Sequence, residues 1–217
     1  MLTNSSIIEE KKMALRIITI SRQYGSGGRA IGKALADALD IDFYDKEILQ
    51  KLAEKSGYTM DFIENQGEYK TNSALSYTTL GTNASMRLEP MISPTDSVVK
   101  MQNELIESLA SSKPCVIIGR GADYLLRERN DVLNVFIYAD EESRIKCIAE
   151  EYEKVSYEEA AKHMKQRDRM KKKHYRYYTD RQWGAMELYD ICLNTTKLSK
   201  ELAVKLLCQV YRELNNS

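Results

Sequence analysis

The chain has 217 residues and carries 32 acidic and 32 basic side chains, so its formal net charge is zero. A neutral chain has no overall field that would favour nucleic acid or an anionic membrane surface. Its hydrophobic content of 43% and charged content of 29% are ordinary for a globular protein, and no apolar run approaches the ~20 residues of a membrane span. We expect one α/β domain over residues 14–217, preceded by a polar, flexible N-terminus over residues 1–13.

The cysteines and histidines do not form a metal-binding pattern. Cys115, Cys147, Cys192 and Cys208 lie in apolar surroundings, and none has a second cysteine at metal-ligand spacing. The chain has only 2 histidines, and without a nearby C-x-x-C pair they disfavour a zinc site. The sequence therefore predicts reduced, buried thiols in a cytoplasmic protein.

The first informative stretch runs from Ile17 to Leu39. Residues 17–20 form an apolar, β-branched run that is typical of a buried parallel strand. A glycine-rich turn follows at 25–28, and apolar residues then recur at helical spacing. A strand, a glycine loop and a helix together favour phosphate binding, because the free N–H groups and the dipole of the helix start attract an anion.

The loop departs from the Walker A pattern G-x-x-x-x-G-K-[ST], whose lysine contacts the β- and γ-phosphates and whose hydroxyl contacts Mg²⁺. One register begins at Gly27 and places Lys33 correctly, but it lacks the hydroxyl and starts well beyond the strand. The other begins at Arg22, directly after the strand, and places Gly28 where the lysine belongs and Arg29 where the hydroxyl belongs. We favour the second register.

In that register the segment resembles the nucleoside monophosphate kinases, most closely a divergent branch of the cytidylate kinase-like family. The resemblance is carried by Ser21-Arg22-Gln23, Gly25-Ser26-Gly27-Gly28, Ile31-Gly32 and Leu35-Ala36. It implies ATP as phosphoryl donor, with Mg²⁺ bridging the donor phosphates, and Arg29 or Arg22 supplying the charge of the missing lysine. The donor-binding residues that it implies are Arg22, Gly25, Ser26, Gly27, Gly28 and Arg29.

Residues 41–49 predict a second short strand, over 41–44, and a helix that begins at Asp45. Asp45 is either only the N-cap of that helix or, as the resemblance implies, a residue that positions the acceptor nucleotide. Lys51 lies one further turn along, near the place where the family carries an arginine that binds phosphate.

Residues 57–95 are rich in Ser, Thr, Asn and Tyr and have weak apolar periodicity. We expect an irregular, partly helical lobe there. Its place in the chain matches the acceptor-binding insertion of cytidylate kinases. Arg87 within this lobe is either a phosphate contact or a solvated arginine.

A helix is predicted over 98–109 and a buried strand over 115–118, which ends at Gly119-Arg120-Gly121. In open α/β sheets ligands gather at the carboxyl ends of strands. Arg120 is either part of a buried structural ion pair or, as the resemblance implies, the residue that binds the acceptor phosphate through its planar fork. Ile118 replaces a carboxylate that many such kinases use to organise Mg²⁺, and Asp123 is the candidate replacement. No residue is assigned as a direct metal ligand.

A strand is predicted over 135–139, with helices over 141–152 and 156–164. The next stretch, residues 162–181, is strongly basic, and three interpretations of it are open. It is the solvated face of a helix, a nucleic-acid-binding patch with interleaved tyrosines, or the lid of a phosphoryl-transfer enzyme. The nucleic-acid interpretation is the least favoured because the run is short. Arg167-Asp168-Arg169 resembles a cytidylate kinase lid without its second acid, and the resemblance implies a lid over 162–182 whose catalytic arginines are Arg167, Arg169 and Arg176.

A last strand over 190–193 and a helix from residue 198 complete an alternating β/α pattern. We predict a P-loop NTPase fold, a three-layer α/β/α sandwich around a parallel five-stranded sheet. The expected function is ATP-dependent transfer of the γ-phosphoryl group to a small acceptor, with CMP as the first choice. The alternative is a catalytically weak nucleotide-binding or regulatory protein. The expected partners are a nucleotide and a small acceptor, not a membrane or nucleic acid.

Overall fold

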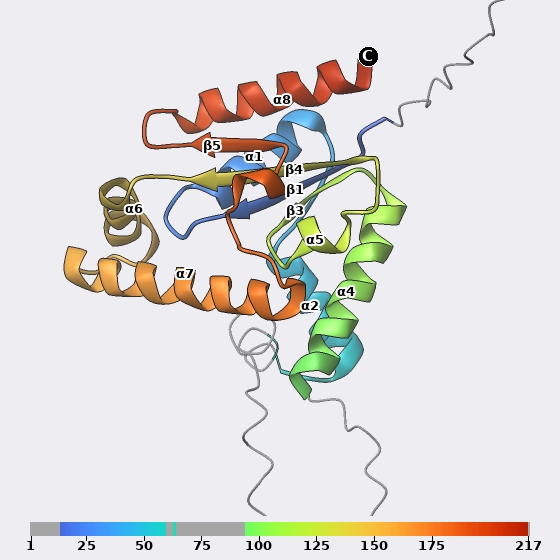
Figure 1. The fold of residues 1–217 in the computed structure, drawn as a ribbon, viewed down its shortest axis with the longest axis horizontal. Helices are drawn as coiled ribbons and strands as arrows, with labels where there is room; N and C mark the ends of the chain where they lie inside the picture. The colour runs from blue at the N-terminus through green and yellow to red at the C-terminus, as the bar shows by residue number, and fades with distance from the viewer. Residues whose placement is uncertain (1–13, 60–62, 64–93, 217) are drawn as a thin grey trace, which may run out of the picture.

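The computed structural model describes residues 14–59, 63 and 94–216. The predicted flexible N-terminus, Arg87 and most of the predicted insertion at 57–95 lie outside these described residues. Residues 17–216 contain the strands and helices that position the site (Figure 1).

A five-stranded parallel sheet lies at the centre of the fold, with strand order β2-β3-β1-β4-β5. Ile17 pairs in register with Cys115 on one side and with Val132 on the other, so β1 occupies the middle of the sheet. The predicted fold class is confirmed. The strands are β1 (Ile17–Arg22), β2 (Asp42–Tyr44), β3 (Cys115–Ile118), β4 (Val132–Tyr138) and β5 (Ile191–Asn194).

The two faces of the sheet are covered by different helices, as the period-2 alternation of side chains along a strand requires. Ile18 and Ile20 of β1 pack in one core cluster with α1 (Gly28–Leu39) and α8 (Lys200–Asn216). Ile17 packs in the core cluster on the opposite face of the sheet, which three further helices cover (Figure 1). These are α2 (Lys46–Ser56), α4 (Pro94–Ser112) and the short α5 (Ala122–Leu125).

The segment after β4 continues as α6 (Glu141–Cys147), the π-helical turn η2 (Ile148–Tyr152) and the long α7 (Tyr157–Thr179). Ser156 and Glu159 form a capping box that starts α7. This helix is longer than the one predicted over 156–164, and it extends from beside α6 to α4 (Figure 1). At its far end the Tyr178 hydroxyl donates to Asp96 of α4 over 3.0 Å.

The buried stripe of α7 contains charged side chains. Met164, Asp168, Lys171 and Tyr175 are buried at spacings of three and four residues, so they share one helix face. Near the carboxyl ends of the strands, Tyr175 joins an aromatic cluster with Phe136, Trp183 and Tyr189. A 3₁₀ turn, η3 (Met186–Leu188), connects this region to β5. The fold therefore turns two charged residues of the basic stretch inward.

All four cysteines lie in the described residues and none forms a disulfide. Burial raises the pKa of the Cys115 thiol to about 12, so this thiol stays protonated near neutral pH. Within residues 14–59 and 94–216, no helix is long and apolar enough to cross a membrane.

Gly32 sets how closely α1 packs on the sheet. A Cβ at this position would lie 2.5 Å from Cδ1 of Ile118 and 3.1 Å from Cδ1 of Ile20. We expect Gly32→Val to lower the free energy of unfolding by about 1–3 kcal/mol, because the two isoleucines are fully buried and would have to shift within the core. Urea denaturation measures the change. Lys33→Val, on the exposed side of the same helix turn, should cost less than about 1 kcal/mol, and equal costs for the two variants would contradict the packing argument.

Candidate functional site

The loop between β1 and α1 is held from both sides by hydroxyl groups. The Ser26 hydroxyl donates to the Gln23 carbonyl over 2.8 Å, and the Thr195 hydroxyl donates to the Ser26 carbonyl over 2.8 Å. Gly27 adopts a left-handed conformation with φ of 76°, and no side chain caps the start of α1. The first amides of α1 therefore have no side-chain cap, and anion binding at this helix start stays a prediction.

The structure supports the register that begins at Arg22. Lys33 lies on the exposed side of α1, where its ammonium pairs with Asp37 over 2.6 Å. Gly32 packs against the sheet inside the helix and does not belong to the loop. The alternative register that used Lys33 as the phosphate-binding lysine is wrong, because this lysine lies beyond the loop.

A cleft of about 580 Å³ opens beside the glycine loop. Six of its lining residues are basic and three are acidic, so in a chain of zero net charge the cleft concentrates positive charge. The basic residues are Arg22, Arg29, Lys46, Arg120, Arg167 and Lys171, and the acidic ones are Asp45, Glu151 and Glu153. Gly25, Gly27 and Gly28 also line the cleft, which joins the predicted donor loop to the predicted acceptor arginine.

Asp45 lies between the two arginines of the loop. Its buried carboxylate makes no capping bond to α2, which begins at the next residue. Instead it accepts a hydrogen bond from Arg29 Nε over 2.5 Å and lies 3.9 Å from the guanidinium of Arg22. Asp45 is therefore part of the cleft and not only the start of a helix.

Arg120 leaves β3 in an unusual backbone conformation. Gly119, Arg120 and Gly121 have φ values of 66°, 60° and 66°, so three successive residues are left-handed. This conformation is uncommon for arginine and costs about 1–3 kcal/mol. Arg120 is nevertheless buried, and it lines both the cleft and a smaller inner cavity of about 30 Å³. The surrounding fold holds the residue at the carboxyl end of the strand.

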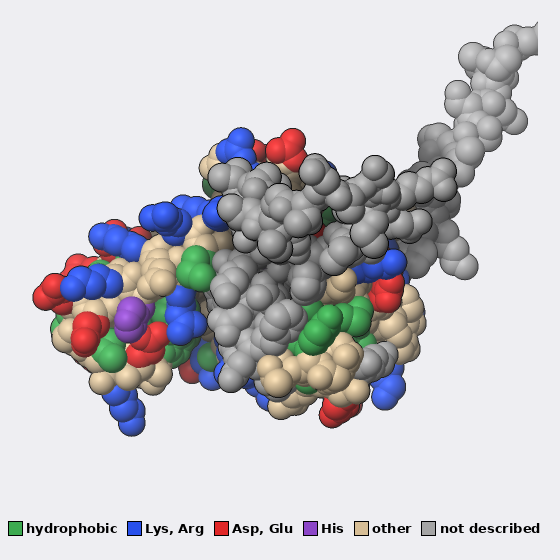
Figure 2. All heavy atoms as spheres, turned by 90° about the horizontal axis from the view of Figure 1, so that it is seen from below, with side chains coloured by type: hydrophobic (Ala, Val, Ile, Leu, Met, Phe, Trp, Pro, Cys, Tyr) green, Lys and Arg blue, Asp and Glu red, His purple; other side chains and the backbone are tan. Residues whose placement is uncertain are grey.

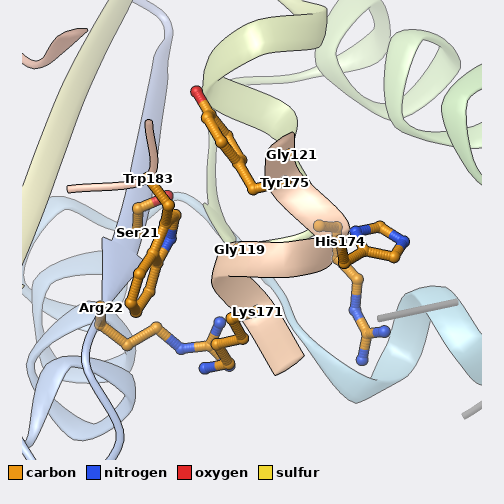
Figure 3. A pocket seen from close by; sticks show the side chains of 9 residues that line it. Ser21, Arg22, Gly119, Gly121, Lys171, His174, Tyr175 and Trp183 are labelled. Carbon is orange, nitrogen blue, oxygen red and sulfur yellow. The ribbon is translucent and has the colours of Figure 1, made fainter. Parts of the chain in front are cut away.

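The inner cavity brings β1, α7 and the β3–α5 turn together. Figure 3 shows the side chain of Arg22 extending from β1 toward Lys171 of α7, below the indole ring of Trp183. Arg120 also lines this cavity. Three basic residues so close together favour a multiply charged anion.

The basic residues of α7 divide between two faces. Arg167 and Lys171 line the cleft, with Lys171 buried and Arg167 45% exposed, whereas Arg169 and Arg176 are exposed and are not among its lining residues. Figure 2 views the side of the molecule that carries α7, where Lys and Arg side chains alternate with Asp and Glu. Lys51 is also exposed, on α2, and does not line the cleft. Lys171 was not singled out from the sequence, although its spacing from Met164 and Tyr175 places it on the inner face.

Asp168 fastens α7 to the glycine loop. One carboxylate oxygen accepts from the Tyr24 amide over 3.0 Å, and the other pairs with the guanidinium of Arg144 on α6. Arg144 Nε in turn donates to the Tyr24 carbonyl over 2.8 Å. Gly25, with φ of 84°, passes so near α6 that a Cβ there would lie 2.7 Å from the Arg144 carbonyl. The Asp of the Arg-Asp-Arg stretch is therefore a support of the loop.

Arg167 has its own anionic partner in the cleft. Its guanidinium lies 3.4 Å from Glu153 and 4.5 Å from the ring centroid of Tyr24. Burial alone would raise the pKa of Glu153, but hydrogen bonds with Tyr24 and His163 and the charge of Arg167 lower it below its ordinary value. Burial and the hydrogen bond to Glu153 raise the pKa of Tyr24. Glu153 thus stays ionised and balances Arg167 near neutral pH.

Asp123 lies behind the inner cavity and does not line the cleft. It accepts a hydrogen bond from the Tyr175 hydroxyl over 2.7 Å and a longer one from Ser21 over 3.4 Å. Burial raises its pKa despite these bonds. Within the described ranges, no three His, Cys, Asp or Glu side chains lie together as a metal site. The protein residues described here thus offer Mg²⁺ no cluster of ligands.

The sheet order, the glycine loop after β1 and the cationic cleft define a P-loop kinase fold, and solved structures agree. A shikimate kinase from Bacteroides thetaiotaomicron is 14% identical, with a TM-score of 0.55 over 92% of this chain and 99% of that one. A gluconokinase from Sinorhizobium meliloti 1021 is also 14% identical, with a TM-score of 0.52 over 93% of this chain and 97% of that one. At this identity the likeness concerns the fold.

The chain belongs to the cytidylate kinase-like family, whose sequence profile matches residues 17–197. An uncharacterized protein from Eubacterium ventriosum is 25% identical to it, with a TM-score of 0.67 over 90% of this chain and 98% of that one. No curated protein matches the sequence. The resemblance drawn from the glycine loop is therefore confirmed at the level of the family.

Removing Arg144 should destabilise the fold, because it would leave the Asp168 carboxylate without its buried partner. We expect Arg144→Met to lower the free energy of unfolding by about 3–5 kcal/mol in urea denaturation. The matched control is Lys165→Met, which removes an exposed ion pair of 3.0 Å, to Glu141, between the same two helices. The control should change the free energy by about 0–1 kcal/mol. Similar losses in both variants would contradict a specific role for the buried pair.

Proposed function

We propose that the protein is an ATP-dependent phosphotransferase that transfers the γ-phosphoryl group to a small anionic acceptor, with a nucleoside monophosphate such as CMP as the first choice. The observation that carries the proposal is the cleft, in which the uncapped start of α1 faces basic residues from β1, β3 and α7. Membership of the cytidylate kinase-like family supports the same reaction.

The donor side of the site is the glycine loop. The amides between Gly25 and Arg29 bind the donor phosphates, and the dipole of α1 adds to their attraction. Arg29 contributes a charge that Asp45 balances in the absence of a ligand. Mg²⁺ bound to ATP would reduce the negative charge of the donor phosphates. The described residues offer the ion no carboxylate cluster, and Arg29 stands where the hydroxyl that usually contacts it belongs.

The acceptor side is the end of β3. Arg120 binds the acceptor phosphate through two nitrogens, since its planar fork matches two phosphate oxygens. Asp45 lies across the cleft and orients the acceptor. The two sites share one cleft, which brings the attacking oxygen close to the γ-phosphorus and reduces the entropy cost of their meeting. Lys51, exposed on α2, remains a candidate only for a more distant contact.

The inner face of α7 stabilises the transferring phosphoryl group. Its three equatorial oxygens carry spread negative charge in the transition state, so preformed cations around them lower the barrier. Arg167 and Lys171 line the cleft and are assigned this role. Arg169 and Arg176, which the family resemblance also implied, lie on the exposed side of the helix.

A second candidate function is nucleotide binding with little catalysis. Two observations favour it: Gly28 stands where the usual lysine belongs, and Ile118 stands where the usual carboxylate belongs. A protein of this kind would bind ATP tightly and form no product.

The direct test measures ADP release from Mg-ATP with CMP, dCMP, UMP, AMP and GMP and with no acceptor. We expect release that depends on the acceptor and that is fastest with one pyrimidine nucleotide. Arg120→Ala should raise the KM for that acceptor by about 10-fold or more, because a charge-assisted bond is lost. Tight binding of ATP without ADP release from any acceptor would instead favour the binding function.

A matched pair of substitutions on α7 tests which face acts in the reaction. Lys171→Ala should lower kcat by about 100-fold, because an inward cation near the transferring group is lost. Arg169→Ala removes a positive charge only two residues away, on the exposed face, and should leave kcat within about 2-fold. Steady-state kinetics with the acceptor found above measures both. The reverse order of effects would assign the role to the exposed arginine.

A further inference from the structure

Arg22 and Gly28 occupy the two positions of the Walker A pattern that differ most from expectation. In the register supported by the structure, Arg22 stands at the first glycine of G-x-x-x-x-G-K-[ST] and Gly28 stands at the lysine. A cation has thus appeared where a glycine is usual, and a glycine has appeared where a cation is usual. We infer that these are one reciprocal exchange, and that Arg22 performs the phosphate-binding task of the lysine. The inference rests on the proposed ATP-dependent function.

The geometry explains why the two changes occur together. A Cβ on Gly28 would lie 2.6 Å from Cβ of Arg22, 3.1 Å from its Cγ and 3.3 Å from Cβ of Ile137. Two non-bonded carbon atoms do not approach to 2.6 Å, and both Cβ positions are fixed by the backbone. Only one of the two positions can therefore carry a side chain. A glycine at the first position makes room for the lysine, and Gly28 makes room for Arg22.

Arg22 fits the task better than Arg29, the other candidate. The Arg22 side chain is 16% exposed, and it lines both the cleft and the inner cavity, beside Lys171. Arg29, in contrast, is 53% exposed, and its Nε donates to Asp45 over 2.5 Å. Arg29 also follows the lysine position and stands where the pattern has its hydroxyl.

Arg22 comes from the strand and not from the helix, yet its Cβ lies only 2.6 Å from where a Cβ of Gly28 would stand, so its side chain starts from nearly the place where the usual lysine starts. Its guanidinium is planar and always charged, and its rigid fork can donate to two phosphate oxygens in a bidentate geometry that the lysine ammonium does not offer. We assign it to the β- and γ-phosphates of the donor. No proton or covalent bond is exchanged in this role; the side chain supplies charge and orientation.

The test is a cycle of substitutions at the two positions, with Mg-ATP binding measured by calorimetry. We expect Arg22→Gly to weaken binding by about 10- to 100-fold, as for the loss of a charge-assisted hydrogen bond. Gly28→Lys alone should lower the melting temperature, because its Cβ collides with Arg22. The double variant Arg22→Gly/Gly28→Lys restores the ordinary pattern and should recover binding to within about 5-fold of the parent.

Two further measurements separate phosphate binding from a structural role. Arg22→Gly should weaken ATP much more than AMP, since AMP lacks the two outer phosphates. Arg22→Lys keeps the cation and the Cβ, and should bind ATP better than Arg22→Gly. Lys33→Ala removes an exposed cation from the same helix and should leave ATP binding unchanged.

The outcomes distinguish this inference from the function on which it rests. If the parent protein binds Mg-ATP and Arg22→Gly binds it equally well, the exchange is overturned and the proposed function stands. If a folded double variant binds no better than Arg22→Gly, the reciprocity is overturned. A parent protein that does not bind Mg-ATP would overturn both.

Discussion

The ion pair between Arg144 and Asp168 is the interaction on which the arrangement of the site depends. Both side chains are largely buried, and together they hold the amide and the carbonyl of Tyr24. A glycine-rich loop has many accessible conformations, and binding a phosphate would have to restrict them. Here two charged side chains fix the loop beforehand, so the start of α1 presents its amides without that cost.

The same pair determines which residues of α7 enter the cleft. Once Asp168 is fixed against the loop, the 3.6-residue period sends Lys171 and Tyr175 inward and leaves Arg169 and Arg176 outside. Tyr175 then reaches Asp123 beneath the inner cavity. The structural support and the candidate phosphate-binding cations are therefore successive turns of a single helix, and changes in one affect the other.

The order of the elements followed from local pattern, because the isoleucine runs of β1 and β3 and the glycine loop are local signals. The exposed position of Lys51 could also be predicted from the sequence, since Ile48, Leu49 and Leu52 form the buried side of α2. The inward position of Lys171 could be predicted in the same way, from its spacing to the apolar residues of α7. The role of Arg144 could not be predicted, because nothing in the sequence of a charged helix indicates that one of its arginines pairs with an aspartate 24 residues away.

The full length of α7 and the ion pair of Asp45 could likewise not be predicted from the sequence and were found only in the three-dimensional structure. Charge patterning described a basic stretch but did not tell whether its acid at Asp168 points to solvent or to the loop. Asp45 has the sequence signature of a cap, yet its carboxylate makes no capping bond and pairs instead with Arg29, which carries a full charge. In both cases tertiary electrostatics overrode the local preference.

The cleft keeps its cations in place through internal counter-charges. Asp45 balances Arg29, and Glu153 balances Arg167. Without these carboxylates the clustered cations would repel one another and carry a desolvation cost. A ligand must therefore interact with the cations more favourably than the carboxylates that it replaces. A single phosphate reaches few of these cations and so gains little over the carboxylate that it replaces, whereas a triphosphate reaches several cations at once. The internal ion pairs thus favour long polyphosphate ligands over inorganic phosphate, in keeping with the proposed nucleotide site.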